Sequence, residues 1–124
     1  MDELLYKQES YFIIGKCMEV HNYFGHGFAE EIYKEALAIE FRTSNILYQR
    51  HKPFEVKYKE QILQQNFIAD FVAFDKIILE VKCITNLTDD HFSEMINFLK
   101  VSNCRLGLII NFARTKLETK RIIY

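Results

Sequence analysis

Three charged residues, Asp70, Glu80 and Lys82, interrupt an otherwise apolar stretch, Asn66–Lys82, which reads NFIADFVAFDKIILEVK. β-Branched and aromatic residues dominate its two apolar runs. Both runs have the length of strands rather than of helices, so a buried β-hairpin is expected. A charge in a buried strand is costly unless it is paired, hydrated or bound to a metal ion. The three charges therefore require a chemical explanation.

Strand geometry offers such an explanation. Glu80 and Lys82 are two residues apart on a strand, so their side chains leave the same face. If Asp70 lies opposite Glu80, the Cβ atoms of the two acidic residues are roughly 5 Å apart. That pair suits one hard divalent cation, which has oxygen ligands at about 2.1 Å if it is Mg²⁺. Lys82 would then orient or deprotonate a water on the ion. The alternative is a simple Glu80–Lys82 ion pair on a solvated strand face.

The loop of the hairpin decides whether the acidic pair can form. A two-residue loop, Asp75-Lys76, sets Asp70 on the face opposite to Glu80, because a one-residue slip inverts every side chain. A three-residue loop that begins at Phe74 brings Asp70 opposite Glu80. The site therefore requires an odd loop or a bulge, although the sequence itself suggests a two-residue turn.

Composition and charge set wider limits. The chain has 124 residues, 49% hydrophobic and 27% charged, with a net charge of −1. We expect a single globular domain, 1–124, without a global basic field, so any nucleic-acid surface must be local. The start of the chain does not resemble a signal peptide, and no apolar run approaches the ~20 residues of a membrane span.

The cysteines and histidines point away from a disulfide or zinc framework. Three cysteines are an odd number without metal-ligand spacing, which is typical of reduced core residues in a cytoplasmic protein: Cys17, Cys83 and Cys104. The histidines considered for zinc also lack ligand spacing: His21, His26 and His91.

Periodicity predicts three helices and a mixed sheet. The helices are expected over Leu4–Phe24, over Phe28–Thr43, and from a cap at Asn86, Thr88 or Asp89 to about Val101. The strands are expected at Leu47–Tyr58 with a break at Pro53, in the central hairpin, in Arg105–Phe112 and within Lys116–Tyr124. The third helix makes the strands before and after it a parallel crossover pair. The fold class is therefore α/β, with helices flanking a mixed sheet.

The first two helices each carry apolar residues at helical spacing, and in the second helix Ala29, Tyr33 and Leu37 lie beside the main stripe. The stripe of the first consists of Tyr11, Phe12, Ile14 and Met18, and that of the second of Ile32, Ala36 and Ile39. Glu30 and Glu31 lie in the first turn of the second helix, where the helix dipole favours carboxylates. On periodicity alone, this is sufficient explanation for Glu30.

The segment Gly27–Tyr33, GFAEEIY, resembles the motif of the GxxExxY proteins, small bacterial and archaeal members of the PD-(D/E)xK nuclease superfamily. The resemblance extends over nearly the whole chain from Ile14 to Ile123. It includes the segments IGKCMEVHNYFGHGFAEEIY, Ala69-Asp70, Glu80-Val81-Lys82, His91, Asn97–Lys100 and Leu106–Phe112.

The resemblance implies a restriction-endonuclease-like αβββαβ core and a nuclease that uses Mg²⁺ or Mn²⁺. It implies Asp70, Glu80 and Glu30 as metal ligands and Lys82 as the group that orients the water. It also directs attention to four further residues around the site: Gly27, Tyr33, His91 and Glu94.

Two of those residues carry specific expectations. Relatives have a glutamine where this chain has Glu94, so Glu94 is expected to approach Lys82 and make it a poorer base. Tyr33 is expected to be a core aromatic whose hydroxyl bonds a carboxylate.

Local cations are candidates for contacts to phosphate. One group lies near the C-terminus, namely Arg114, Lys116, Lys120 and Arg121, and a second consists of Lys57 and Lys59. Each group taken alone is also compatible with an ordinary solvated face.

Two functions remain open from the sequence. The first is a metal-dependent nuclease acting on DNA or RNA. The second is a catalytically weak or inactive module of the same fold that binds nucleic acid or associates with itself. A homodimer could form through edge strands near Leu47–Tyr58 or the C-terminus.

Overall fold

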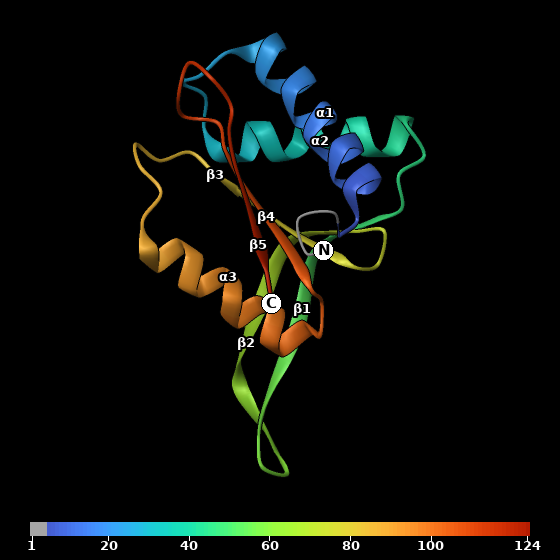
Figure 1. Ribbon diagram of the computed structural model, residues 1–124, viewed down its shortest axis with the longest axis vertical. Helices are drawn as coiled ribbons and strands as arrows, with labels where there is room; N and C mark the ends of the chain where they lie inside the picture. The colour runs from blue at the N-terminus through green and yellow to red at the C-terminus, as the bar shows by residue number, and fades with distance from the viewer. Residues whose placement is uncertain (1–4) are drawn as a thin grey trace.

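Five strands form one mixed sheet with helices on both faces in the computed structural model, which describes residues 5–124 (Figure 1). The elements in chain order are α1 (Lys7–Phe24), α2 (Glu30–Thr43), β1 (Tyr48–Tyr58), β2 (Gln61–Ala73), β3 (Ile77–Lys82), α3 (Asp89–Ser102), β4 (Leu106–Asn111) and β5 (Glu118–Ile123). The strands lie in the order β1-β2-β3-β4-β5. The predicted start of the first helix at Leu4 lies outside the described residues.

The predicted crossover is present. Strands β3 and β4 pair in parallel, and every other neighbouring pair is antiparallel. Helix α3 connects the two parallel strands, because parallel neighbours need a long connection. The α/β class with a mixed, helix-flanked sheet is therefore confirmed.

The sheet has one apolar cluster on each face. Helices α1 and α2 cover the face that carries Phe71, Leu79 and Leu108. Helix α3 covers the other face, where Met95 packs with Val72, Ile78 and Ile109. Gly107 of β4 lets α3 approach closely, since a Cβ atom at that position would lie 2.2 Å from Sδ of Met95. This close packing sets the position of Glu94, the neighbour of Met95 in sequence.

The apolar stripes read from the sequence are only partly the buried faces of α1 and α2: Ile14 and Ala36 pack against the core, and the other members are exposed. Tyr11 is 73% exposed, and Phe12, Met18, Ile32 and Ile39 are exposed as well. The buried apolar residues lie one or two positions away, at Ile13, Cys17 and Val20 in α1 and at Tyr33, Leu37 and Phe41 in α2. Each helix has two overlapping apolar stripes, and its hydrophobic periodicity does not distinguish them.

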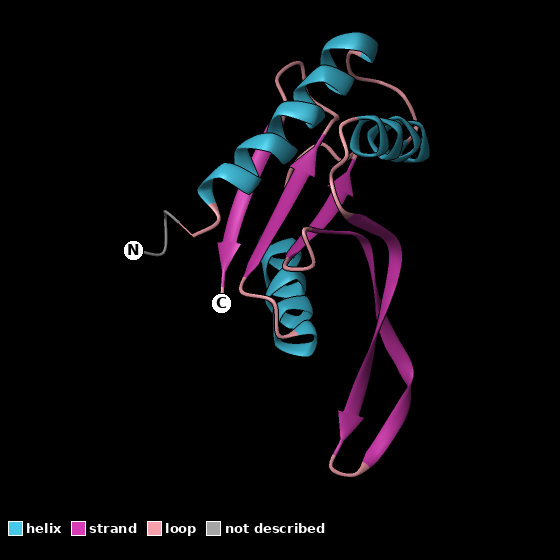
Figure 2. Ribbon diagram, turned by 90° about the vertical axis from the view of Figure 1, so that its right-hand side faces the viewer, coloured by secondary structure: helices cyan, strands magenta, loops and turns pink. Residues whose placement is uncertain are grey.

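Strands β1 and β2 form a long hairpin that projects beyond the rest of the sheet (Figure 2). Its outer part is exposed on β2 from Gln61 to Asn66, while the inner end of the same strand is buried. The predicted break at Pro53 is wrong, because β1 runs through it. Strand β1 is an edge strand of the sheet, where a proline is tolerated.

The register of the β2–β3 hairpin is the one that an acidic pair requires. Phe71 pairs with Leu79, and one further step along both strands places Asp70 opposite Glu80. The loop has three residues, 74–76, and its first two have left-handed φ angles of 56° and 58°. The prediction of an odd loop is confirmed.

Candidate active site

The carboxylates of Asp70 and Glu80 meet where β2 separates from β3. Oε2 of Glu80 accepts a hydrogen bond from the backbone N–H of Asp70 at 2.7 Å. Oδ2 of Asp70 accepts one from the backbone N–H of Val81 at 2.8 Å. The backbone pairing of the two strands ends at the adjacent pair, Phe71 with Leu79. Beyond that pair, the two carboxylates accept hydrogen bonds from backbone N–H groups of the facing strand. These bonds fix the position of both side chains.

The side-chain alternation of β2 is interrupted beside this pair. Ala69 and Val72 pack in the same α3-side cluster, although residues three apart on a regular strand point to opposite faces. On the neighbouring strand, His51 has a left-handed φ of 54° between two regular pairs of the ladder. Because of this irregularity, Asp70 can bond both β3 and helix α2.

A buried lysine of α2, Lys34, makes the contact to Asp70. Its ammonium lies 2.9 Å from Oδ1 of Asp70 and 2.9 Å from Oε2 of Glu30. A third carboxylate, that of Glu31, lies at 3.5 Å. Burial acts to lower the pKa of Lys34, but the hydrogen bonds to Glu30 and Asp70 outweigh it, so the pKa lies above its ordinary value. Lys34 is therefore a fixed positive charge.

Lys34 is not among the site residues that the sequence predicts. The available signal was its spacing, because Lys34, Leu37, Ala38 and Phe41 follow the i, i+3, i+4, i+7 pattern of a buried helix face. A lysine on such a face is unusual and needs a partner.

Glu80 is only 6% exposed. Burial and then the charge of Asp70 raise the pKa of its carboxyl to about 8, although Lys82 acts in the opposite direction. Without a cation, this carboxyl therefore retains a proton near neutral pH. Two adjacent carboxylates, one of which is held protonated, provide the oxygen donors that a hard divalent ion prefers.

The third predicted metal ligand is placed differently. Glu30 bonds the Lys34 ammonium, and its carboxylate does not form a ligand group with Asp70 and Glu80. Within residues 5–124, no three His, Cys, Asp or Glu side chains are arranged to share a metal ion. The donor set that fits a divalent ion is thus the pair Asp70 and Glu80.

Lys82 lies on the α3 side of the pair and meets Glu94, as expected from the sequence. Its Nζ is 3.5 Å from Oε1 of Glu94. Both side chains are partly exposed, at 21% for Lys82 and 49% for Glu94. Among the residues that the structure describes, Lys82 therefore has one carboxylate partner, at a long distance and near solvent.

Tyr33 supports the fold at the start of α2. It is fully buried, and its ring stacks on that of Phe112 at a centroid distance of 4.5 Å. Its hydroxyl donates to the carbonyl of Gly25 at 2.6 Å and accepts from the N–H of Phe28 at 3.2 Å. The expectation that it bonds a carboxylate is wrong. Tyr33 instead closes the α1–α2 loop that leads into Glu30.

Two other residues of the resemblance also have structural roles. Gly27 has a φ of +107°, which side-chain-bearing residues rarely adopt, so the α1–α2 loop requires a glycine there. Nδ1 of His91 accepts a hydrogen bond from the N–H of Thr88 at 2.9 Å at the start of α3. His91 therefore caps α3.

The four C-terminal cations do not form one cluster. Arg121 donates to Oγ of Ser10 at 2.8 Å and to the carbonyl of Leu5, which ties β5 to the start of α1. Lys120 pairs with Ile109 and so lies on the α3 face. Arg114 and Lys116 are exposed on the β4–β5 loop, and Arg114 donates to Oδ1 of Asn86 at 3.3 Å.

Asn111, at the end of β4, is a further residue that the sequence analysis did not single out as part of the site. It is fully buried and pairs with Lys82 across the parallel ladder. Its side chain donates to the carbonyl of Ile84 at 2.8 Å and accepts from the N–H of Ile84 at 3.1 Å. It also donates to Glu118 at 3.0 Å. Asn111 thereby fixes the chain that leaves β3 after Lys82.

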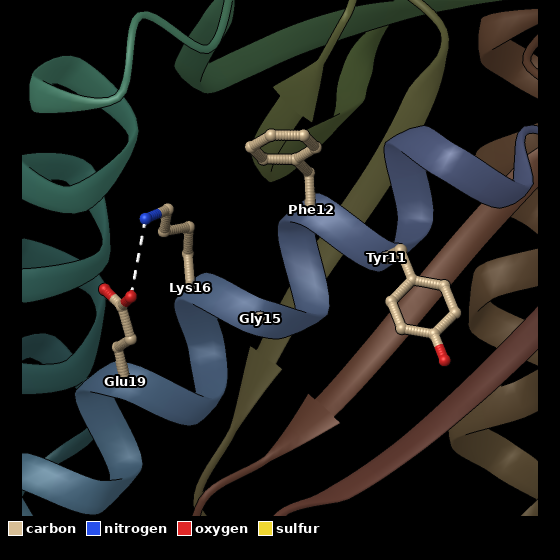
Figure 3. A pocket seen from close by; sticks show the side chains of 5 residues that line it. All are labelled: Tyr11, Phe12, Gly15, Lys16 and Glu19. Atoms are coloured by element: carbon tan, nitrogen blue, oxygen red, sulfur yellow. Dashed lines mark hydrogen bonds and ion pairs between the residues drawn. The ribbon is translucent and has the colours of Figure 1, made fainter.

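The surface is also hollowed at α1, away from these residues. Figure 3 shows Tyr11, Phe12, Gly15, Lys16 and Glu19 around that hollow, with the Lys16 ammonium 3.5 Å from Glu19. The acidic pair and Lys82 do not line it.

Within residues 5–124, none of the helices combines the length and the apolar character needed to cross a bilayer.

Comparison with known proteins identifies the family. The family model described as PD-(D/E)XK nuclease superfamily matches residues 7–122, nearly the whole chain. The chain therefore belongs to the PD-(D/E)XK nuclease superfamily, and the mixed sheet with helices on both faces agrees with the restriction-endonuclease-like fold of that class. Nucleases of this superfamily generally use divalent metal ions and act on nucleic acid.

A solved structure shares the fold. The crystal structure of SSO0001 matches with a TM-score of 0.60 and 11% sequence identity, over 92% of this chain and 76% of that one. No curated protein matches the chain.

Proposed function

We propose that the protein is a metal-dependent nuclease that hydrolyses phosphodiester bonds in nucleic acid. The observation that carries this proposal is the Asp70–Glu80 pair, in register across the hairpin and fixed by reciprocal hydrogen bonds at 2.7 and 2.8 Å. Lys82 follows Glu80 by two residues on the same strand face, in the order that the nuclease superfamily requires.

Asp70 and Glu80 would hold one Mg²⁺ or Mn²⁺ ion. Such an ion supplies Lewis-acid polarisation of a phosphoryl oxygen. A bound ion would keep Glu80 in its charged form, because a neighbouring cation favours the charged carboxylate. Lys82 orients the attacking water and stabilises the negative charge that develops on the phosphate. Since Lys82 is partly exposed, substrate can reach its ammonium.

Within the superfamily, we propose membership of the GxxExxY group and a prokaryotic, cytoplasmic protein. The motif residues support the first point, since the backbone at Gly27 needs a glycine and Tyr33 closes the loop before Glu30. Three free cysteines are compatible with a reducing compartment: Cys17, Cys83 and Cys104.

Contacts to the nucleic-acid backbone are proposed at two places. Arg114 and Lys116 lie on the loop after β4, at the same end of the parallel β3–β4 pair as Lys82. Lys57 and Lys59 lie at the tip of the projecting β1–β2 hairpin, which is exposed and could reach along a duplex (Figure 2). Arg121 is excluded from this role because its donors serve Ser10 and Leu5.

The direct test is hydrolysis of labelled single- and double-stranded DNA and RNA in the presence of Mg²⁺ or Mn²⁺ at about 5 mM. Cleavage that EDTA abolishes and that Glu80→Ala eliminates would support the proposal. Calorimetry with the same ions is the independent readout. Absence of both cleavage and ion binding in a correctly folded protein would refute it.

The contact between Lys82 and Glu94 favours a second candidate. A carboxylate 3.5 Å from the lysine partly neutralises the charge that hydrolysis needs. The alternative function is therefore a catalytically weak or inactive nuclease-fold module that binds nucleic acid or forms a homodimer. Binding of DNA or RNA without cleavage, or a dimer in sedimentation equilibrium, would favour it.

A further inference from the structure

Lys34 is the feature that the proposed mechanism does not use. It is buried, yet it carries a full positive charge among three carboxylates, two of them at 2.9 Å. A buried charge of this kind persists only when its partners compensate for the lost hydration. Glu30 and Asp70 provide that compensation, and both were predicted as metal ligands.

The position of the ammonium is that of a cation shared by two carboxylates. One oxygen of Asp70 faces Lys34, and the other accepts the N–H of Val81, the residue that follows Glu80. Asp70 thus stands between the Lys34 ammonium on one side and Glu80 on the other. Two-metal hydrolytic sites place two cations on either side of a shared carboxylate, about 3.5–4 Å apart.

We infer that the Lys34 ammonium occupies a second cation site of the protein, held by Glu30 and Asp70, so that the chain binds one divalent ion where a two-metal enzyme binds two. This inference rests on the proposed function for its role in hydrolysis. Glu30 then positions Lys34 and does not bind metal.

Lys34 acts here as a built-in charge. Because it is covalently part of the chain, the ammonium cannot leave the site, so it faces Asp70 at 2.9 Å whether or not a metal ion is present. Its burial and its two short contacts also keep it from reaching substrate. Lys34 is thus a permanent positive charge, whereas the charge of the divalent ion at Asp70 and Glu80 depends on the metal concentration.

The experiment counts bound Mn²⁺ per chain by calorimetry and by metal analysis after gel filtration. The parent protein should bind one ion, and Lys34→Ala should bind two, because removal of the ammonium frees Glu30 and Asp70. Lys34→Arg should keep the parent count, since it retains the charge. Thermal stability is the second readout, and Mn²⁺ should raise the melting temperature of Lys34→Ala more than that of the parent.

The matched control is Lys16→Ala. Lys16 also contacts two carboxylates, Glu19 at 3.5 Å and Glu40 at 4.0 Å, but it lies on α1 away from the acidic pair. Its removal should leave the ion count unchanged. An extra ion in this control would show that any freed carboxylate pair captures Mn²⁺, which would overturn the inference.

Glu30→Gln keeps the inference testable if Lys34→Ala does not fold. The Glu30 side chain is 39% exposed, so this change is tolerable. If Glu30 only holds Lys34, the variant binds as many ions as the parent, whereas loss of an ion assigns Glu30 to the metal and refutes the inference.

Two ions bound by the parent protein, or no additional ion bound by folded Lys34→Ala, would refute the inference as well. A parent that binds none, with a gain of one in Lys34→Ala, would refute the proposed nuclease but not the cation site.

Discussion

The acidic pair has a lysine on each side, and the two lysines are held very differently. Lys34 is buried and bonded to two carboxylates at 2.9 Å, whereas Lys82 is partly exposed and has one carboxylate at 3.5 Å. A charge fixed by short contacts serves electrostatic balance, because it cannot move toward a substrate. A loosely paired charge near solvent can change partner during a reaction. The same residue type thus has a structural role on the α2 side, and we propose a chemical role for it on the α3 side.

The two carboxylates differ in the same way. Asp70 forms an ion pair with Lys34, whereas no lysine or arginine within residues 5–124 forms an ion pair with Glu80. The pKa of Glu80 is accordingly raised to about 8, with burial as the main cause. We therefore expect a bound metal ion to stabilise the charged form of Glu80 more than that of Asp70, and we expect the two carboxylates to respond differently to substitution.

The largest effect is expected from Glu80→Ala. Loss of this ligand should weaken Mn²⁺ binding by more than about 100-fold and eliminate hydrolysis, while circular dichroism remains that of the parent. Calorimetry on the purified variant measures the first effect. If the variant keeps its Mn²⁺ affinity, Glu80 is not a metal ligand. The metal site would then lie on the Lys34 side, and the proposed difference between the two sides would be wrong.

Lys82→Ala should have the next largest effect. Removal of one charge that stabilises the transition state typically lowers the rate by about 10² to 10³-fold. Mn²⁺ affinity should stay unchanged or increase, because the variant removes a positive neighbour. Lys100→Ala, an exposed lysine on α3, is the control and should retain the parent rate. Equal rates for the two variants would mean that Lys82 has no role in the chemistry.

Stability should change in opposite directions at the two carboxylates. In EDTA, Asp70→Asn should lose about 3 kcal/mol, because Lys34 is left buried with one fewer partner. Glu80→Gln should gain roughly 2 to 4 kcal/mol at pH 8, because it keeps an acceptor for the Asp70 N–H and removes a buried charge. Urea unfolding of both variants measures this difference, and the same sign for both would contradict it.

The pH dependence follows from the raised pKa of Glu80. Its ordinary value is 4.5 and its folded value is about 8, so the folded state binds the proton more tightly. The stabilising contribution of the proton is complete below pH 4.5 and is lost as the pH rises through 8. In EDTA, the free energy of unfolding of the parent should therefore fall over this range relative to that of Glu80→Gln. Parallel curves would contradict the raised pKa.

The sequence predicts the α3 side of the site better than the α2 side. Asp70, Glu80 and Lys82 lie on one hairpin, where strand periodicity and loop length determine which side chains meet. The odd loop could be deduced before the structure for that reason. Lys34 approaches Asp70 across two elements that are distant in sequence, and its burial depends on how α2 packs on the sheet.

The helix faces show the same limit. Tyr11 and Phe12 are aromatic but exposed, while Ser10 of the same helix is buried and accepts a hydrogen bond from Arg121. Hydrophobicity alone therefore does not distinguish the buried face of α1 from its exposed face. The hydroxyl of Tyr33 was likewise expected at a carboxylate, but the backbone of the α1–α2 loop provides closer partners. Local periodicity indicates that a helix exists, and tertiary packing decides its orientation.

The smallest effect is expected from Glu94→Gln. The Lys82–Glu94 pair is half exposed and 3.5 Å long, and such pairs contribute at most about 1 kcal/mol. Removing the charge of Glu94 frees the Lys82 ammonium for the attacking water and the phosphate, so metal-dependent cleavage should rise about threefold, equivalent to roughly 0.7 kcal/mol. Glu31→Gln is the matched control, because Glu31 contacts Lys34 at the same distance on the other side. Initial rates under saturating Mn²⁺ compare the two variants.

If Glu94→Gln is slower than the parent, Glu94 assists Lys82 instead of restraining it. If Glu31→Gln speeds cleavage equally, the gain comes from net charge and the two lysines do not differ as described.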